Sequence, residues 1–136
     1  MEKGGKQHNL VRKDLLYPEL SYKINGVLFE VYRQLGGGHL EKYYQLAIKN
    51  ALEKEGLRFQ EQVYVPLKFN DKVIGKYYLD FLIEDKIILE LKRGKIVPIS
   101  NINQVKQYLI ALNLKLAIIV SFLQTGARIN RVLNEY

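Results

Sequence analysis

Two apolar stretches on either side of a short charged turn place the strongest constraint on how this chain can fold. Apolar side chains recur at every second position of residues 79–83 and 87–91, and residues 84–86 between them are all charged. Successive side chains of a β-strand point to opposite faces. We therefore expect a hairpin with one core-facing apolar surface, formed by Leu79, Phe81, Ile83, Ile87, Leu89 and Leu91.

The opposite face of this expected hairpin carries three charged side chains. Asp80 lies in the first strand, and Glu90 and Lys92 lie two residues apart in the second. Asp80 and Glu90 share a face only if the residue numbers of two opposed residues add up to an even value. A turn of three residues, a common length in hairpins, gives such a register. Because charges are rarely buried without partners or a metal ion, the three form either a solvated outer face or a functional site.

Helical spacing dominates the chain before this hairpin. Residues 18–35 repeat apolar side chains at intervals of three and four, which predicts a helix, and the three glycines of residues 36–38 end it. A second helix is expected over about residues 39–55, with Gly56 as its C-terminal cap. Two helices therefore precede the first strand.

After Arg58 the period changes to the alternation that is typical of strands. Strands are expected over residues 63–69, 73–83 and 87–92, and a third helix follows Pro98 and closes at Asn113. Residues 116–120 form a continuous apolar run, as expected for a strand covered on both faces. Residues 126–136 should add a short strand or helix. The order ααβββαβ indicates an α/β sandwich with a central mixed sheet flanked by helices.

Size and charge narrow the class of protein. The chain has 136 residues, which is enough for one core. We expect a flexible polar segment over residues 1–17, followed by a single domain over residues 18–136. Lysine and arginine outnumber aspartate and glutamate by 21 to 14, a net charge of +7, and this suits a nucleic-acid partner. The basic residues are spread along the chain, and a role in solubility explains their surplus equally well.

Missing residue types exclude several kinds of chemistry. Without cysteine the chain has neither disulfides nor thiolate catalysis, and with two histidines a multi-histidine zinc site is not expected. Carboxylates would have to hold any metal, which favours magnesium, manganese or calcium. No apolar run approaches the roughly 20 residues of a membrane helix, and the first residues lack the apolar stretch of a signal peptide. A cytoplasmic location without membrane contact is expected.

The three charged side chains of the hairpin suit phosphodiester hydrolysis. That reaction requires one or two divalent cations, which activate water and neutralise charge on the phosphate. Asp80 and Glu90 are oxygen ligands for such a cation, and Lys92 can stabilise developing charge or orient the attacking water. Asp followed at a distance by Glu-x-Lys is common by chance, so the interpretation depends on their placement on one face of two adjacent strands.

Several motifs follow one another along the chain. Residues 38–44 contain a GxxExxY pattern, Asp and Glu-x-Lys follow in the hairpin, and Gln-x-x-x-Tyr lies in the third helix; the positions are Gly38, Glu41, Tyr44, Asp80, Glu90, Lys92, Gln104 and Tyr108. In these motifs the chain resembles the GxxExxY family, a small prokaryotic group within the PD-(D/E)XK nuclease superfamily, over roughly residues 20–120. Leu79 stands where the superfamily name has proline, a position that varies across the superfamily.

The resemblance implies a restriction-endonuclease-like fold and a divalent metal, Mg²⁺ or Mn²⁺, held by Glu41, Asp80 and Glu90. The alternative for Glu41 is a purely structural role in the first turn of its helix, where the helix dipole favours a carboxylate. Gln104 and Tyr108 lie four residues apart on one helix face and are similar to an auxiliary motif of the exonuclease branch, which holds substrate or aligns the site. Such a pair also arises in ordinary amphipathic helices.

The function expected from these features is metal-dependent, nuclease-like hydrolysis of nucleic acid, with DNA favoured as the partner. The alternative is a catalytically silent nucleic-acid-binding or protein-interaction module that keeps the fold. The choice between DNA and RNA stays open, as does that between endonuclease and exonuclease. Sequence-specific cleavage would require a partner or a homodimer.

Three further side chains have both a functional and a structural interpretation. Tyr77 and Tyr78 can stack on bases, although strand tyrosines usually serve packing. Glu61 is expected to be an ordinary outward residue of its strand.

Overall fold

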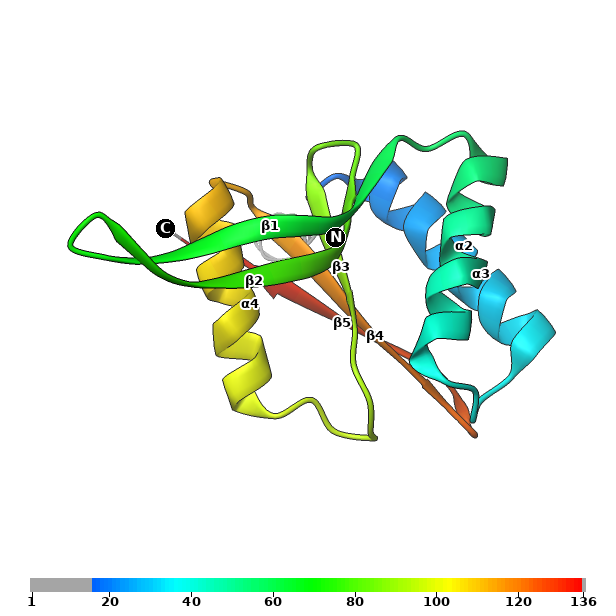
Figure 1. Ribbon diagram of the computed structural model, residues 1–136. Coiled ribbons are helices and arrows are strands. Elements are labelled where there is room, and N and C mark those ends of the chain that lie inside the picture. The colour runs from blue at the N-terminus through cyan, green and yellow to red at the C-terminus, as the bar shows by residue number, and fades with distance from the viewer. Residues whose placement is uncertain (1–15, 136) are drawn as a thin grey trace, which may run out of the picture.

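A five-stranded mixed sheet with helices on both faces organises the chain (Figure 1). The computed structural model describes residues 16–135, so most of the segment 1–17 that was expected to be flexible lies outside the described residues. The elements are α2 (Pro18–Leu35), α3 (Glu41–Glu55), β1 (Phe59–Phe69), β2 (Lys72–Ile83), β3 (Ile87–Leu91), α4 (Ile99–Leu112), β4 (Leu116–Leu123) and β5 (Gly126–Leu133).

The strands lie in the order β1-β2-β3-β4-β5. All neighbours pair antiparallel except β3 and β4, which are parallel and are connected through α4. The expected α/β architecture with a mixed sheet is therefore confirmed. Residues 126–133, for which strand and helix had both been open, form the edge strand β5, and the element order becomes ααβββαββ.

Two separate cores pack against the two faces of the sheet. Helices α2 and α3 cover one face and α4 covers the other, as the ribbon view shows (Figure 1). Strand β4 contributes to both cores, because Leu116, Ile118 and Val120 belong to the α2/α3 cluster and Ala117 and Ile119 to the α4 cluster. The continuous apolar run of this strand is thus covered on both faces, as predicted.

The expectation of one apolar surface on the hairpin is wrong for one residue. Five of the six predicted side chains lie in the α2/α3 core, but Leu79 lies in the α4 core with Ile88. The alternation breaks at the next residue, Asp80, which is also where the pairing of β2 with β3 ends. Beside this point Gln62 of β1 has a φ of 49°, which is uncommon for a residue other than glycine and distorts the strand.

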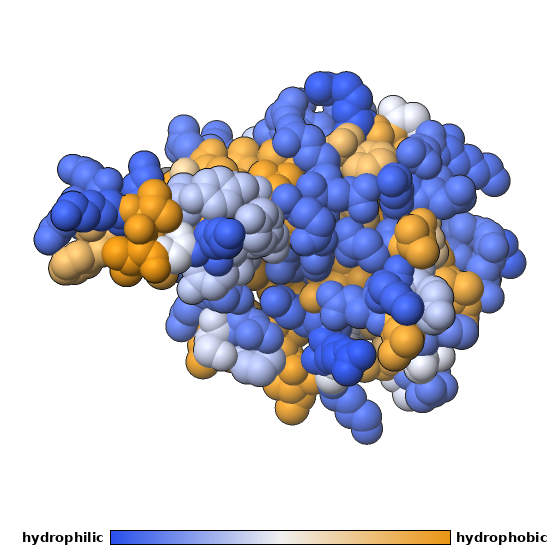
Figure 2. Space-filling model, in the orientation of Figure 1, coloured by the Kyte–Doolittle hydropathy of each residue, from blue (hydrophilic) through white to orange (hydrophobic). Residues whose placement is uncertain are grey.

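Strands β1 and β2 continue far beyond the rest of the sheet. Residues 63–79 form a two-stranded arm, called here the β1–β2 arm, which leaves β3 and projects past α4 (Figure 1). Its end exposes the apolar side chains of Phe69, Val73 and Ile74. Figure 2 shows hydrophobic residues gathered at this end of the molecule.

The helix boundaries follow local signals closely. Helix α3 begins at Glu41, two residues later than expected, and ends before Gly56, whose φ is 77°. Helix α4 ends before Asn113, whose φ is 56°, as its position in the sequence predicted. None of the described helices is long and apolar enough to cross a membrane.

Candidate functional site

The site lies where strands β2 and β3 part. Their last ladder pair on this side is Phe81 with Leu89, so Asp80 and Glu90 come next and stand opposite each other. The backbone N–H of Asp80 donates a 2.7 Å hydrogen bond to Glu90 Oε2, and the N–H of Leu91 donates a 2.8 Å bond to Asp80 Oδ2. The predicted even-sum register is therefore present, and each carboxylate takes the place of a missing ladder partner.

Burial disfavours the charged forms of these two carboxylates. Glu90 is only 4% exposed and Asp80 is half-buried. Desolvation, followed by the charge of Asp80, raises the pKa of Glu90 to about 7. Burial is also the main cause that raises the pKa of Asp80, and the charge of Glu41 adds to it. Two carboxylates in one partly dry space repel each other, and a bound cation would relieve that repulsion.

Lys92 reaches the same place from the end of β3. Its Nζ lies 3.5 Å from Glu90 Oε1, and its side chain is 21% exposed. Its backbone N–H donates to the carbonyl of Val120, which holds this end of the chain against β4. The ammonium charge lowers the pKa of both carboxylates, but less than burial raises it. The lysine therefore only partly neutralises the pair.

Tyr108 approaches the carboxylates from α4. The side chain is buried, and its ring centroid lies 5.4 Å from that of Tyr77. Burial, followed by the charges of Glu90 and of other neighbours, raises the pKa of its hydroxyl well above the ordinary value. The hydroxyl thus stays protonated and can donate a hydrogen bond. Gln104, one helical turn earlier, is half-buried on the same helix.

The start of α3 is held in place by Tyr44. Its hydroxyl donates a 2.6 Å hydrogen bond to the carbonyl of Gly36 and accepts one from the N–H of His39. Its ring stacks on Phe122 at 4.4 Å. Gly38 has a φ of 90°, which other residues adopt only with strain. The glycine and the tyrosine of the GxxExxY pattern are therefore structural here.

Glu41, the first residue of α3, lies exposed at the edge of the site. Its charge acts on the pKa of Asp80, so the helix brings it to the same side as the carboxylate pair. Among residues 16–135, however, no three carboxylate or imidazole side chains lie close enough together to enclose a metal ion. Glu41 as a third metal ligand stays a prediction.

The donor set of Asp80 and Glu90 nevertheless fits a hard divalent cation. Mg²⁺ usually keeps several waters and is bound through one or two carboxylates, completed by phosphate oxygens of the substrate. Each of the two carboxylates uses one oxygen for the opposite strand, and burial raises the pKa of both more than the charge of Lys92 lowers it. A two-carboxylate site of this kind suits Mg²⁺ or Mn²⁺ better than a closed protein cage would.

Sequence reasoning missed the amide and acidic side chains that surround Asp80. Gln45 of α3 lies between the Asp80 carbonyl and Glu61 Oε1, at 3.4 and 3.5 Å. Glu61, expected to be an ordinary outward residue, instead forms a 3.2 Å ion pair with Lys49 of α3. A hydrogen bond from Gln62 lowers the pKa of Asp80. The register of β1 against β2 brings Glu61 and Gln62 to the site, and the packing of α3 brings Gln45.

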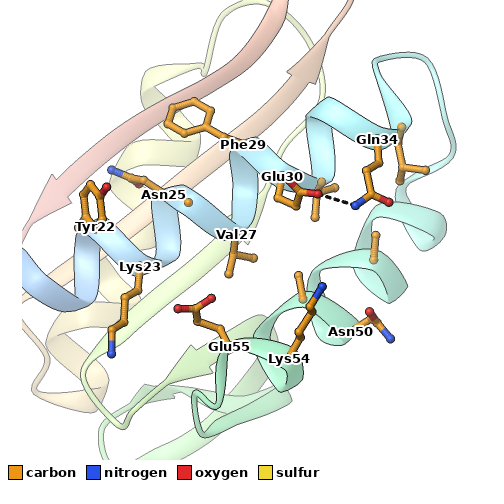
Figure 3. Close-up of a pocket in the computed structure, with 15 residues that line it drawn as sticks. Tyr22, Lys23, Asn25, Val27, Phe29, Glu30, Gln34, Asn50, Lys54 and Glu55 are labelled. Carbon is orange, nitrogen blue, oxygen red and sulfur yellow. Dashed lines mark hydrogen bonds between the residues drawn. The ribbon is translucent and has the colours of Figure 1, made fainter.

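A surface hollow of about 820 Å³ lies elsewhere, between α2 and α3 (Figure 3). Val27 points from α2 toward α3, and the lining includes the small residues Gly26, Ala47 and Ala51. None of the side chains of the Asp80–Glu90 site lines it. The hollow is therefore a gap between two helices and is separate from the candidate site, which lies where β2 and β3 diverge.

Comparison with known proteins bears on the family and the fold of this chain. A family model described as "PD-(D/E)XK nuclease superfamily" matches residues 18–132. A solved structure titled "Crystal structure of SSO0001" is similar with a TM-score of 0.57 at 17% identity, over 70% of this chain and 50% of that one. This chain thus spans about half the length of that structure, and the likeness concerns the fold. No curated protein matches.

Proposed function

Because this chain belongs to the PD-(D/E)XK nuclease superfamily, we propose that its Asp80–Glu90 site hydrolyses phosphodiester bonds in DNA with the help of a divalent metal ion. Nucleases of this superfamily generally use divalent metals and act on nucleic acid. The observation that carries the proposal is the pair of reciprocal hydrogen bonds that sets two buried carboxylates side by side. The pKa of each of these carboxylates is raised, and perturbed pKa values cluster at functional sites.

Each side chain of the site has a chemical role in this proposal. Asp80 and Glu90 would hold Mg²⁺ or Mn²⁺, which supplies charge neutralisation at the phosphate and a more acidic water. Lys92, 3.5 Å from Glu90, would donate a hydrogen bond to the phosphate or to the attacking water. Tyr108 and Gln104 would position the substrate from α4, and Glu41 would assist from the start of α3.

The proposal also covers the family, the substrate and the domain organisation of the chain. Membership of the GxxExxY family is supported by Gly38, Glu41 and Tyr44, whose glycine and tyrosine hold the start of α3. A nucleic-acid substrate is supported by the net charge of +7, and DNA is the form that we propose. We further propose that residues 18–136 act as one domain, and that a homodimer or partner supplies any sequence specificity.

Cleavage assays with matched variants test the function. Linear, circular and branched DNA are incubated with the wild type and Mg²⁺ or Mn²⁺, then with a chelator, and in parallel with Asp80→Asn and Asp85→Asn. Both variants remove one negative charge from the same hairpin, but Asp85 lies in its exposed turn. We expect cleavage by the wild type and Asp85→Asn that the chelator abolishes, and none by Asp80→Asn. Equal degradation by all three would reveal a contaminant and favour the silent binding module.

A further inference from the structure

One face of the β1–β2 arm carries a pair of exposed aromatic rings. Tyr64 and Tyr78 are directly opposed in the β1–β2 register, and their ring centroids lie 6.0 Å apart. They are 47% and 48% exposed. Helix α4 covers the other face of the arm, where Tyr77 packs, and no helix covers this one (Figure 1). The two rings are therefore available to a ligand, whereas Tyr77 is partly buried.

The arm around these rings is basic. Residues 63–79 contain three lysines and one acidic residue, Asp71. Lys76 Nζ lies 5.9 Å from the centroid of the Tyr78 ring, so a positive charge sits beside the aromatic pair. An exposed aromatic face with adjacent lysines is the combination by which proteins hold single-stranded nucleic acid, through base stacking and phosphate contacts.

The pair also lies close to the proposed catalytic site along β2. Tyr78 and Asp80 are two residues apart on β2, which corresponds to about 7 Å along the strand. One nucleotide of an extended strand covers a comparable distance, so bases on the rings would belong to the nucleotides beside the scissile phosphate. In duplex DNA each base already stacks on its neighbours, so only an unpaired segment offers free base faces.

We propose that Tyr64 and Tyr78 form a stacking platform for unpaired bases, and that the substrate is a single-stranded nucleic acid or a single-stranded segment of a larger one. Lys76 contacts the phosphate backbone at the platform. The inference rests on the proposed function for its substrate class. Binding, however, does not require cleavage, so the two can fail separately.

Fluorescence anisotropy in the presence of a chelator tests the platform without catalysis. A labelled deoxythymidine oligomer is titrated with the full chain, with Tyr64→Ala/Tyr78→Ala, with Tyr64→Phe/Tyr78→Phe and with Tyr22→Ala. Tyr22 is 80% exposed on α2 and is the matched control. Since stacking on each ring contributes a substantial part of the affinity, we expect the double alanine variant to bind about 10-fold or more weakly. The phenylalanine variant and Tyr22→Ala should bind like the wild type.

A second experiment uses the wild-type protein alone and so does not depend on the folding of any variant. An oligomer of the same length and charge in which abasic sites replace thymines should bind about as weakly as the thymidine oligomer binds the double alanine variant. Blunt duplex DNA should be insensitive to the tyrosine substitutions. A uridine oligomer compared with the thymidine oligomer shows whether DNA or RNA is the preferred source of the unpaired bases.

Three results would overturn the platform. Equal binding of the thymidine and abasic oligomers by the wild type would show that the backbone alone is recognised. Unchanged binding by a folded double alanine variant would show that the rings take no part. If the wild type self-associates in sedimentation and the double alanine variant does not, with oligomer binding unchanged, the β1–β2 arm binds a second copy of the chain. Loss of cleavage in Asp80→Asn with retained stacking would leave both proposals standing.

Discussion

The backbone N–H of Asp80 donates a hydrogen bond to the carboxylate of Glu90, and this contact joins the two strands where their regular pairing stops. Glu90 is thereby fixed with its second oxygen toward Lys92. The arrangement keeps two acidic groups close together and partly desolvated. A bound cation or a proton can offset the free-energy cost of this arrangement. Several predictions depend on that cost.

The stability of the metal-free protein should fall as pH rises. The pKa of Glu90 is raised from 4.5 to about 7 in the folded state, so the folded state holds a proton that the unfolded state releases. The contribution is complete below pH 4.5 and is lost as pH rises through about 7. We expect the free energy of unfolding to drop by on the order of 2 kcal/mol over this window, as measured by urea denaturation with chelator. Glu90→Gln should flatten the slope; equal slopes would contradict the assignment.

A divalent metal should stabilise the wild type at pH 8 and should not stabilise Asp80→Asn. Without metal, Asp80→Asn should melt at least as high as the wild type, because it removes repulsion from Glu90 and Glu41. Thermal unfolding with Mg²⁺, with Mn²⁺ and with chelator measures both effects. Asp85→Asn is the control and should respond to metal like the wild type. A metal-induced shift that persists in Asp80→Asn would place the cation elsewhere.

Lys92→Ala should separate cleavage from metal binding. The carboxylates that would hold the metal remain, so the thermal shift with Mg²⁺ should persist. Cleavage should fall on the order of 10²-fold or more, because a charge-stabilising group is lost. Lys115→Ala removes the same charge at the exposed start of β4 and should retain activity. Equal activity of the two variants would remove Lys92 from the mechanism.

Glu41→Gln should weaken the response to metal while leaving the fold nearly unchanged. Glu41 is exposed, so its structural contribution is limited to about 1 kcal/mol from the helix dipole. Its charge nevertheless acts on Asp80, and we expect a smaller metal-induced thermal shift. Glu53→Gln, at the exposed end of the same helix, is the control. If both variants respond to metal like the wild type, Glu41 has only a structural role.

Two glycine substitutions should have opposite effects on stability. A Cβ at Gly37 would lie 2.6 Å from the carbonyl oxygen of Leu123, so Gly37→Ala must displace backbone and should destabilise the fold by about 1–3 kcal/mol. Gly26→Ala, in the middle of α2 with no atom outside the adjacent helix backbone and its chain neighbours within 4 Å of the added carbon, should stabilise by about 0.5–1 kcal/mol. Chemical denaturation of both variants measures the difference. A neutral Gly37→Ala would show that the loop can shift without cost.

Local patterns account for the part of the fold that could be predicted. The change of period after Arg58, the glycines after α2 and Asn113 after α4 each act over a few residues, so the helices, the strands and their order follow from the sequence. The three-residue turn likewise determines that Asp80 stands opposite Glu90, because a hairpin register depends on turn length. The edge strand β5 could not be distinguished from a helix, since its short segment has no clear period.

Packing between distant segments decided the rest. Leu79 joins the α4 core at the point where β2 leaves β3, and no local pattern in the sequence indicates where two strands part. Gln45 and Tyr108 come to the carboxylates on helices separated from them in the chain. The sequence by itself therefore determined the elements and the opposed acids, since these depend on neighbouring residues. Only the tertiary structure decided which helices reach those acids and how deeply they are buried, because burial depends on all the elements packed together.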